Sequence, residues 1–118
     1  MNIYENQTFI VNNLKDALET IGNIKKTKII NLFHPYNSLV WQGPNFVKII
    51  NDQISNKKIN FIVESGTNIG LTLSLIDLGI KKISVSKKIN GETLTKISSI
   101  AKKKKIKIYY TEKFKSLK

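Results

Sequence analysis

Glu64 is the side chain of this sequence that is best placed for acid–base or ligand chemistry. It follows the apolar run 59–63 and precedes a tight polar turn. A strand of that composition is covered on both faces of a sheet, so its last residue is expected to be partly shielded from water. A shielded carboxylate can serve as a base, a metal ligand or a ribose-binding group. We expect Glu64 to be half-buried and directed at residues 34–42; the alternative is a structural carboxylate that caps its own turn or pairs with a lysine.

His34, the only histidine, is the natural partner of Glu64, because it also follows an apolar run, residues 29–33. These two residues are the candidates for catalysis. The rest of the sequence argues against an enzyme, since it has no cysteine, no second histidine and no second acid expected beside Glu64. Zinc, Mg²⁺ and two-carboxylate chemistry therefore lack ligands, and we expect neither a metal nor a cofactor. The alternative for His34 is a structural role.

The turn after Glu64 has the composition of an anion-binding loop. Its glycines would let a ligand approach the backbone, and the helix that follows offers free N–H groups. Two aromatic residues of the 34–42 segment could stack on a planar ligand. The turn is neither a Walker A loop nor a GxGxxG fingerprint, so an ordinary strand-to-helix turn is the alternative. The expected ligand-binding residues are Tyr36, Trp41, Glu64, Ser65, Gly66, Thr67, Asn68 and Gly70.

Apolar periodicity predicts the elements that would position these residues. Helical patterns alternate with β-like runs, and the segment 34–42 between them reads as a loop. This alternation indicates one α/β domain over residues 1–118, with three layers: a mostly parallel five-stranded sheet and helices on its faces. The carboxyl ends of parallel strands meet at one edge, where the candidate site would lie. The predicted strands are 8–11, 29–33, 59–63, 83–85 and 106–110.

Three further expectations concern the arrangement of these elements. The first choice of strand order is flavodoxin-like, 2-1-3-4-5, and the second is a half-barrel with strands in sequence order. The helix at 68–78 is apolar on most sides, so we expect either a homodimer through this helix or a cover from within the chain. Residues 111–118 read as a loose C-terminal tail.

The net charge of +12 points to a polyanionic partner such as nucleic acid. All twenty basic residues are lysine. The absence of arginine argues against sequence-specific DNA recognition, because arginine makes the bidentate contacts to guanine and phosphate. A genome rich in A and T would also give a sequence rich in lysine, isoleucine and asparagine without selection for binding. No signal peptide or membrane-spanning run is visible, so a soluble cytoplasmic protein with no membrane contact is expected.

Several short motifs resemble a group of short uncharacterised bacterial α/β proteins. They are His34-Pro35, Gly43-Pro44-Asn45-Phe46, Glu64-Ser65-Gly66-Thr67, Gly70 and the helix from Leu73 to Gly79. The resemblance implies the fold and brings no activity with it.

A second resemblance is to the receiver domain of two-component signalling. Asn12-Asn13 and Glu64 stand where that family has its acidic residues, Ser84 or Ser86 matches its hydroxyl residue, and Lys107 matches its lysine. Since asparagine replaces the Mg²⁺-binding acids, the resemblance implies a pseudo-receiver, a protein–protein module without phosphotransfer.

The sequence thus favours a small, non-catalytic α/β module that binds a small anionic ligand or a partner protein at the edge where the strands end. The alternatives are a basic accessory protein that binds nucleic acid without sequence specificity, and a small enzyme that uses Glu64 and His34.

Overall fold

A sheet of five parallel strands forms the centre of the computed structural model, which describes residues 2–25, 27–54 and 56–117. The strands lie in sequence order, β1-β2-β3-β4-β5, and every neighbouring pair is parallel. The α/β class with a parallel sheet is therefore confirmed. The strands are β1 (Thr8–Ile10), β2 (Ile30–His34), β3 (Ile59–Gly66), β4 (Lys82–Val85) and β5 (Lys107–Tyr110).

The flavodoxin-like strand order is wrong, and the half-barrel order is the one observed. In the flavodoxin-like order β1 would have a neighbour on each side. Here β1 has three residues, pairs with β2 alone, and leaves Ile10 exposed. A short strand with an exposed apolar side chain suits an edge better than the middle of a sheet.

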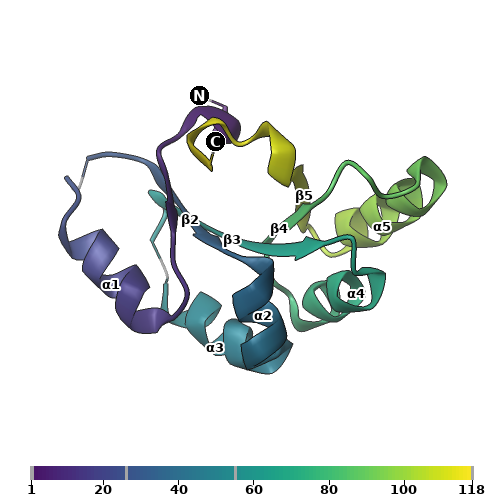
Figure 1. Cartoon of the computed structure of the whole chain (residues 1–118), viewed down its shortest axis with the longest axis horizontal. Helices are drawn as coiled ribbons and strands as arrows, with labels where there is room; N and C mark the ends of the chain where they lie inside the picture. Colours follow the sequence, from purple (N-terminus) through teal and green to yellow (C-terminus); the bar gives the residue numbers. More distant parts are fainter. Residues whose placement is uncertain (1, 26, 55, 118) are drawn as a thin grey trace.

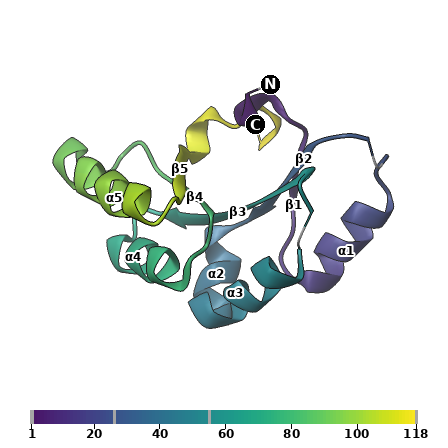
Figure 2. The same cartoon turned by 180° about the vertical axis from the view of Figure 1, so that it is seen from behind.

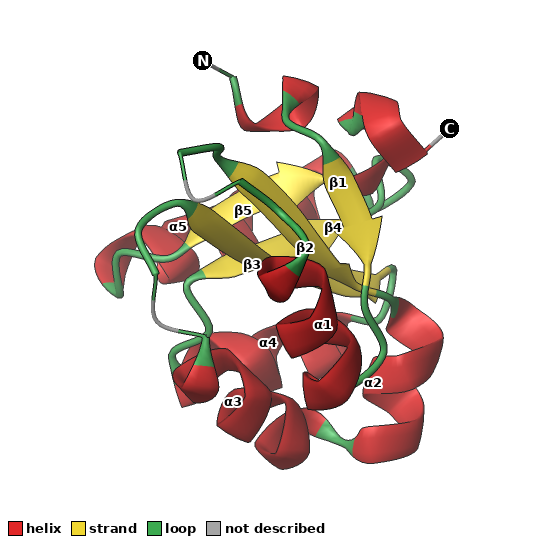
Figure 3. Cartoon of the chain, turned by 90° about the vertical axis from the view of Figure 1, so that its left-hand side faces the viewer, coloured by secondary structure: helices red, strands yellow, loops and turns green. Residues whose placement is uncertain are grey.

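All α-helices lie on one face of the sheet (Figure 1; seen from behind in Figure 2). Parallel strands in sequence order, joined by right-handed crossovers, place every connecting helix on the same side. The opposite face is covered by a thinner layer from the two ends of the chain, which we call the terminal layer (residues 2–7 and 111–117; Figure 3). The helices are α1 (Leu14–Gly22), α2 (Tyr36–Gln42), α3 (Pro44–Gln53), α4 (Ile69–Leu78) and α5 (Gly91–Lys103).

The predicted loop 34–42 is wrong for most of its length, because residues 36–42 form α2. Pro35 stands at the N-cap, Leu39 is buried against the sheet, and Gly43 ends the helix with φ +86°. The segment is too short for its apolar period to be recognised, since it has only two turns and a single buried residue.

Side chains alternate between two cores across the sheet. Leu32 of β2 and Val63 of β3 belong to the larger core beneath the helices. Phe33 and Ile62, one residue along from Leu32 and Val63, belong to a smaller core beneath the terminal layer. Both faces of the central strands are therefore covered, which agrees with their continuously apolar sequence.

Residues 111–117 are packed against the sheet, so the loose tail is a wrong prediction for these residues; residue 118 lies outside the described range. Phe114 is fully buried, with its ring centroid 4.8 Å from that of Tyr4 and 5.8 Å from that of Phe33. In the sequence, Phe114 is a single aromatic residue among lysines. Charge and composition alone therefore predict a solvated tail for this segment.

Helix α4 obtains its cover from within the chain. Leu75 and Ile76 are buried, and α4 packs between α3 and α5 as well as on the sheet. Leu73, at 40%, is the most exposed large apolar residue of α4. Among the described residues, no helix has both the length and the apolar character that a membrane crossing requires.

Candidate functional site

Glu64 lies at the carboxyl end of β3, half-buried, with its carboxylate directed at α2 as expected. Its Oε1 accepts a hydrogen bond of 2.9 Å from the backbone N–H of Tyr36. The first N–H groups of a helix have no partner within the helix, and Pro35 supplies no side-chain cap. Glu64 therefore caps α2 from a neighbouring strand, and its negative charge is favourable at the positive end of the helix dipole.

The turn that follows packs beside the Tyr36 ring. Gly66 has φ +59°, and a Cβ placed on it would lie 3.6 Å from the Tyr36 ring. The Tyr36 hydroxyl accepts a hydrogen bond of 3.2 Å from Asn68 Nδ2, and Asn68 Oδ1 caps α4 by accepting from the N–H of Leu71 at 3.0 Å. These contacts account for the Gly and Asn of this turn as parts of the fold.

The other expected ligand-binding residues divide into buried and exposed ones. The Ser65 hydroxyl is buried and bonded to that of Thr72 at 2.7 Å, while Thr67 and Gly70 are exposed. Trp41 is 90% exposed, on the solvent side of α2, and does not close the end of the sheet. The structure thus brings Tyr36, Glu64, Gly66 and Asn68 together and leaves Trp41 apart from them.

His34 is fully buried at the end of β2 and does not pair with Glu64. Its Nε2 lies 2.8 Å from Oε1 of Gln42, whose amide nitrogen donates to the carbonyl of Asn12. Nδ1 makes no hydrogen bond of good geometry among the described residues, although the backbone of Val11 lies near enough to act on the ring. Burial lowers the pKa of His34 and outweighs the opposing effects of the Gln42 side chain and the Val11 backbone. The ring is therefore neutral near pH 7 and belongs to the core, with its centroid 5.8 Å from that of Phe61.

A second acid lies at this edge, contrary to expectation. Glu112, just after β5, accepts hydrogen bonds from the Ser86 hydroxyl at 2.7 Å and from the backbone N–H of Lys87 at 3.0 Å. Although burial on its own raises the pKa of Glu112, these hydrogen bonds lower it. Sequence reasoning missed Glu112 because it placed residues 111–118 in a loose tail. Within the described ranges, no three His, Asp or Glu side chains gather in a way that could hold a metal ion.

The opposite edge of the sheet, where the strands begin, is strongly basic. Each crossover from a helix to the next strand returns the chain to this edge. The crossovers into β2, β3, β4 and β5 are all rich in lysine, and Lys104 is the only lysine there with an ion pair among the described residues, at 3.6 Å from Asp77. We call this surface the lysine edge; it contains Lys25, Lys28, Lys57, Lys58, Lys81, Lys82, Lys102, Lys103, Lys104, Lys105 and Lys107.

Two of these lysines lie side by side on neighbouring strands. Lys82 of β4 and Lys107 of β5 are directly opposite in the strand register. Burial lowers the pKa of Lys82, and the charge of Lys107 lowers it further. Like charges in such cross-strand pairs destabilise a sheet. Among the described residues, the lysines of this edge other than Lys104 have no ion pair, so the lysine edge carries an excess of positive charge.

No family model, curated protein or solved structure shows a significant match to this chain. The function is therefore inferred from the two edges of the sheet.

Proposed function

We propose that the protein binds nucleic acid without sequence specificity, through the backbone phosphates, and that the lysine edge is the binding surface. The observation that carries the proposal is the pairing of Lys82 with Lys107, two like charges that lie opposite each other on neighbouring strands, where burial and the charge of Lys107 lower the pKa of Lys82. Such an arrangement costs stability in the free protein and gains it when an anion is bound. We expect this activity in the cytoplasm.

The geometry of the lysine edge suits an extended polyanion. Neighbouring strands lie about 4.8 Å apart, so the crossovers into β2, β3, β4 and β5 span roughly 15 Å. Ten of the eleven lysines are exposed, and Lys82 is half-buried. Lysine contacts phosphate as a point charge and cannot make the bidentate contacts of arginine to guanine. Binding of this kind holds the backbone and does not read the bases.

Salt dependence is the direct test. About four phosphate contacts predict a slope of log K on log salt of roughly −3 for single strands and between −3 and −4 for duplexes. Fluorescence anisotropy with a labelled mixed-sequence RNA or DNA, over a series of KCl concentrations, measures this slope. Absence of binding at low salt would contradict the proposal. Equal affinity for anionic lipid vesicles would indicate a membrane surface as the partner instead.

A matched pair of variants locates the surface. Replacing Lys58, Lys81 and Lys107 by glutamine removes one exposed lysine from each of three neighbouring crossovers and should reduce the salt slope by about 2 to 3. The control replaces three exposed lysines at the opposite edge, Lys15, Lys87 and Lys88, and changes the net charge by the same amount. If both triple variants lose affinity equally, binding follows net charge and the lysine edge is not a site.

A partner protein on α2 is the second candidate, and the exposure of Trp41 favours it. Trp41 at 90% and Val40 at 54% lie on the solvent side of α2, and Phe46 of the adjoining α3 is 48% exposed. Tryptophan is among the residues that contribute most to protein interfaces when it is buried there.

Self-association through this surface, or through α4 as the sequence suggested, is tested by sedimentation over a range of concentrations. Trp41 is the only tryptophan, so its fluorescence would shift to shorter wavelength as the surface is covered. A monomer at all concentrations, with unchanged emission, removes the homodimer.

A further inference from the structure

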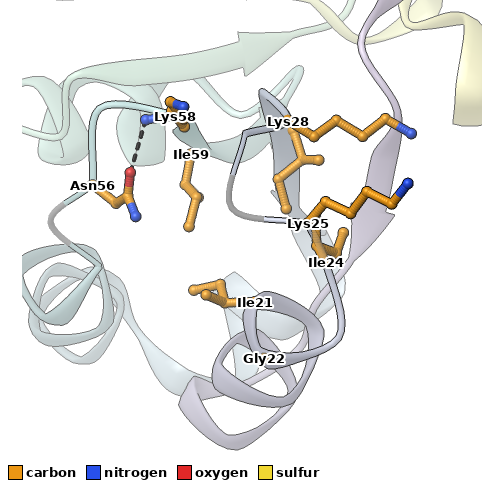
Figure 4. Close-up of a pocket in the computed structure, with 9 residues that line it drawn as sticks. Ile21, Gly22, Ile24, Lys25, Lys28, Asn56, Lys58 and Ile59 are labelled. Carbon is orange, nitrogen blue, oxygen red and sulfur yellow. Dashed lines mark hydrogen bonds between the residues drawn. The ribbon is translucent and has the colours of Figure 1, made fainter.

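A hollow of about 320 Å³ lies beneath the C-terminal end of α1, between that helix and the starts of β2 and β3 (Figure 4). This volume is at the lower end of the range of small-molecule sites in proteins. Figure 4 shows Ile21 and Ile59 inside the hollow, with Gly22 at the end of α1 beside them. The hollow lies on the lysine edge and far along the strands from Glu64.

The apolar part of the hollow is entirely aliphatic. Four isoleucines, Ile21, Ile24, Ile30 and Ile59, contribute the apolar side chains, and none of the described residues that line it is aromatic. A nucleotide base would gain most from aromatic rings on which it could stack. An alkyl group needs only apolar surface. Each methylene that leaves water contributes to the binding free energy, whatever its orientation. The lining therefore favours an aliphatic group over a base.

The polar part of the lining carries positive charge, and no acid is among the described residues that form it. Lys25, Lys28 and Lys58 line the same hollow, together with Asn56. Lys28 is held in place, since its Nζ donates to Oε1 of Gln7 at 3.0 Å. In Figure 4 the stem of Lys25 lies beside Ile24, and the amines of Lys25 and Lys28 both point away from Ile21 and Ile59. Methylene stems beside apolar surface and amines in water are the arrangement that receives a molecule with an alkyl end and an anionic end.

A second hollow, of about 450 Å³, adjoins the first and shares three of its lining residues, Ile24, Lys25 and Lys28. Polar side chains of Gln7, Thr20 and Asn23 line the remainder, with Phe9. Lys25 and Lys28 therefore line both hollows, of which the first has aliphatic side chains and the second has polar and apolar ones. If these lysines bound a carboxylate, its alkyl chain would lie in the first hollow. Its hydrating water would lie on the side of the second.

We propose that this pair of hollows binds a medium-chain aliphatic carboxylate, with the alkyl chain among the four isoleucines and the carboxylate on Lys25 and Lys28. The proposal is separate from nucleic-acid binding, because it requires the apolar lining as well as the charge. Octanoate is the probe, acetate matches its charge without the chain, and octanol matches its chain without the charge.

Calorimetry and NMR on the unmodified protein give the first test. Binding of octanoate should saturate, and each methylene from hexanoate to octanoate should tighten binding by about three- to fourfold. Acetate and octanol should each bind at least tenfold more weakly. The methyl resonances of Ile21, Ile24, Ile30 and Ile59 should shift on titration with octanoate. Absence of saturable binding below the micelle concentration, or shifts confined to other isoleucines, overturns the proposal.

Gly22→Leu tests the location without a cost in folding. Gly22 is the last residue of α1, has no unusual backbone angle, and would have no heavy atom within 4 Å of an added Cβ. Leucine is favoured over glycine in a helix, so the variant should keep or raise its melting temperature. Its side chain would occupy the hollow and should weaken octanoate binding at least tenfold. Unchanged affinity in the folded variant places the ligand elsewhere and overturns the proposal.

A lysine pair tests the carboxylate. Replacing Lys25 and Lys28 together by glutamine should weaken octanoate binding about tenfold or more and leave octanol binding unchanged. The control replaces Lys102 and Lys103, two exposed lysines of the same edge that do not line the hollows. Equal losses in the two variants would show general attraction to a basic surface and contradict a site.

Discussion

The carboxylate of Glu64 has a defined partner, so its substitution separates capping from binding. Glu64→Gln keeps an oxygen that can accept from Tyr36 N–H but removes the charge at the helix N-terminus. We expect a loss of about 0.3–1 kcal/mol in the free energy of unfolding. Glu64→Ala removes the acceptor as well and should cost about 1–2 kcal/mol. Urea denaturation measures both; losses that are equal would show that the charge alone stabilises the fold.

Gly66 and Gly70 form a second test at the residue scale. Gly66→Ala should cost about 1–2 kcal/mol, because an L-residue at φ +59° is strained whatever the space around it. Gly70 lies in the first turn of α4, and Gly70→Ala should leave stability unchanged or raise it by up to about 1 kcal/mol. Denaturation of the two variants checks the difference; equal effects would contradict the left-handed backbone at Gly66.

His34 gives the protein a predictable pH dependence. Its pKa is lowered from 6.5 by burial, so between 6.5 and the folded pKa the unfolded chain binds a proton that the folded protein does not. Stability should therefore be complete above pH 6.5 and fall as the pH decreases below it, by at most about 1.4 kcal/mol per pH unit. Urea denaturation between pH 8 and pH 5.5 measures this slope, and His34→Gln should abolish it. A slope that persists in His34→Gln would assign it to other groups.

At the scale of elements, the sequence predicts a helix or a strand correctly where the apolar periodicity extends over several turns or over a whole strand. The four longer helices and the covered strands β2 and β3 follow from such patterns. Helix α2 could not be predicted, because it has one buried residue in two turns. Strand order depends on contacts between strands, which no local pattern contains. The Glu64 carboxylate could be placed because a strand end fixes its position, whereas its partner became clear only with the helix that Tyr36 begins.

The pair Lys82 and Lys107 offers a prediction about the strands β4 and β5. Lys107→Glu places opposite charges directly across the sheet and should raise stability by roughly 0.2–1 kcal/mol at low salt. The pKa of Lys82 should rise in the same variant, which NMR can follow. Lys57→Glu makes the same change of charge on an exposed residue outside β4 and β5 and should gain less. Equal gains would attribute the effect to net charge.

For the whole molecule, the terminal layer is expected to be an integral part of the fold. Phe114→Ala should cost about 3–5 kcal/mol, because it empties the centre of the smaller core. The neighbouring Lys115, exposed and paired with Glu5 at 3.2 Å, is the control, and Lys115→Ala should cost about 1 kcal/mol or less. Thermal denaturation compares the two. A small loss of stability for Phe114→Ala would contradict this prediction and favour a loose tail.

The terminal layer also has a consequence for the order in which the molecule is completed. Strands in sequence order can join the sheet one after another as the chain is made, each beside its predecessor. The smaller core differs, because it joins residues that are far apart in the sequence. The Tyr4 hydroxyl accepts a hydrogen bond from the backbone N–H of Tyr110, 106 residues along the chain. Loop closure over such a separation comes late. Until residues 111–117 are synthesised, Phe33 and Ile62 lack the cover of Phe114, and the nascent chain exposes an apolar face that a chaperone or a second chain could bind.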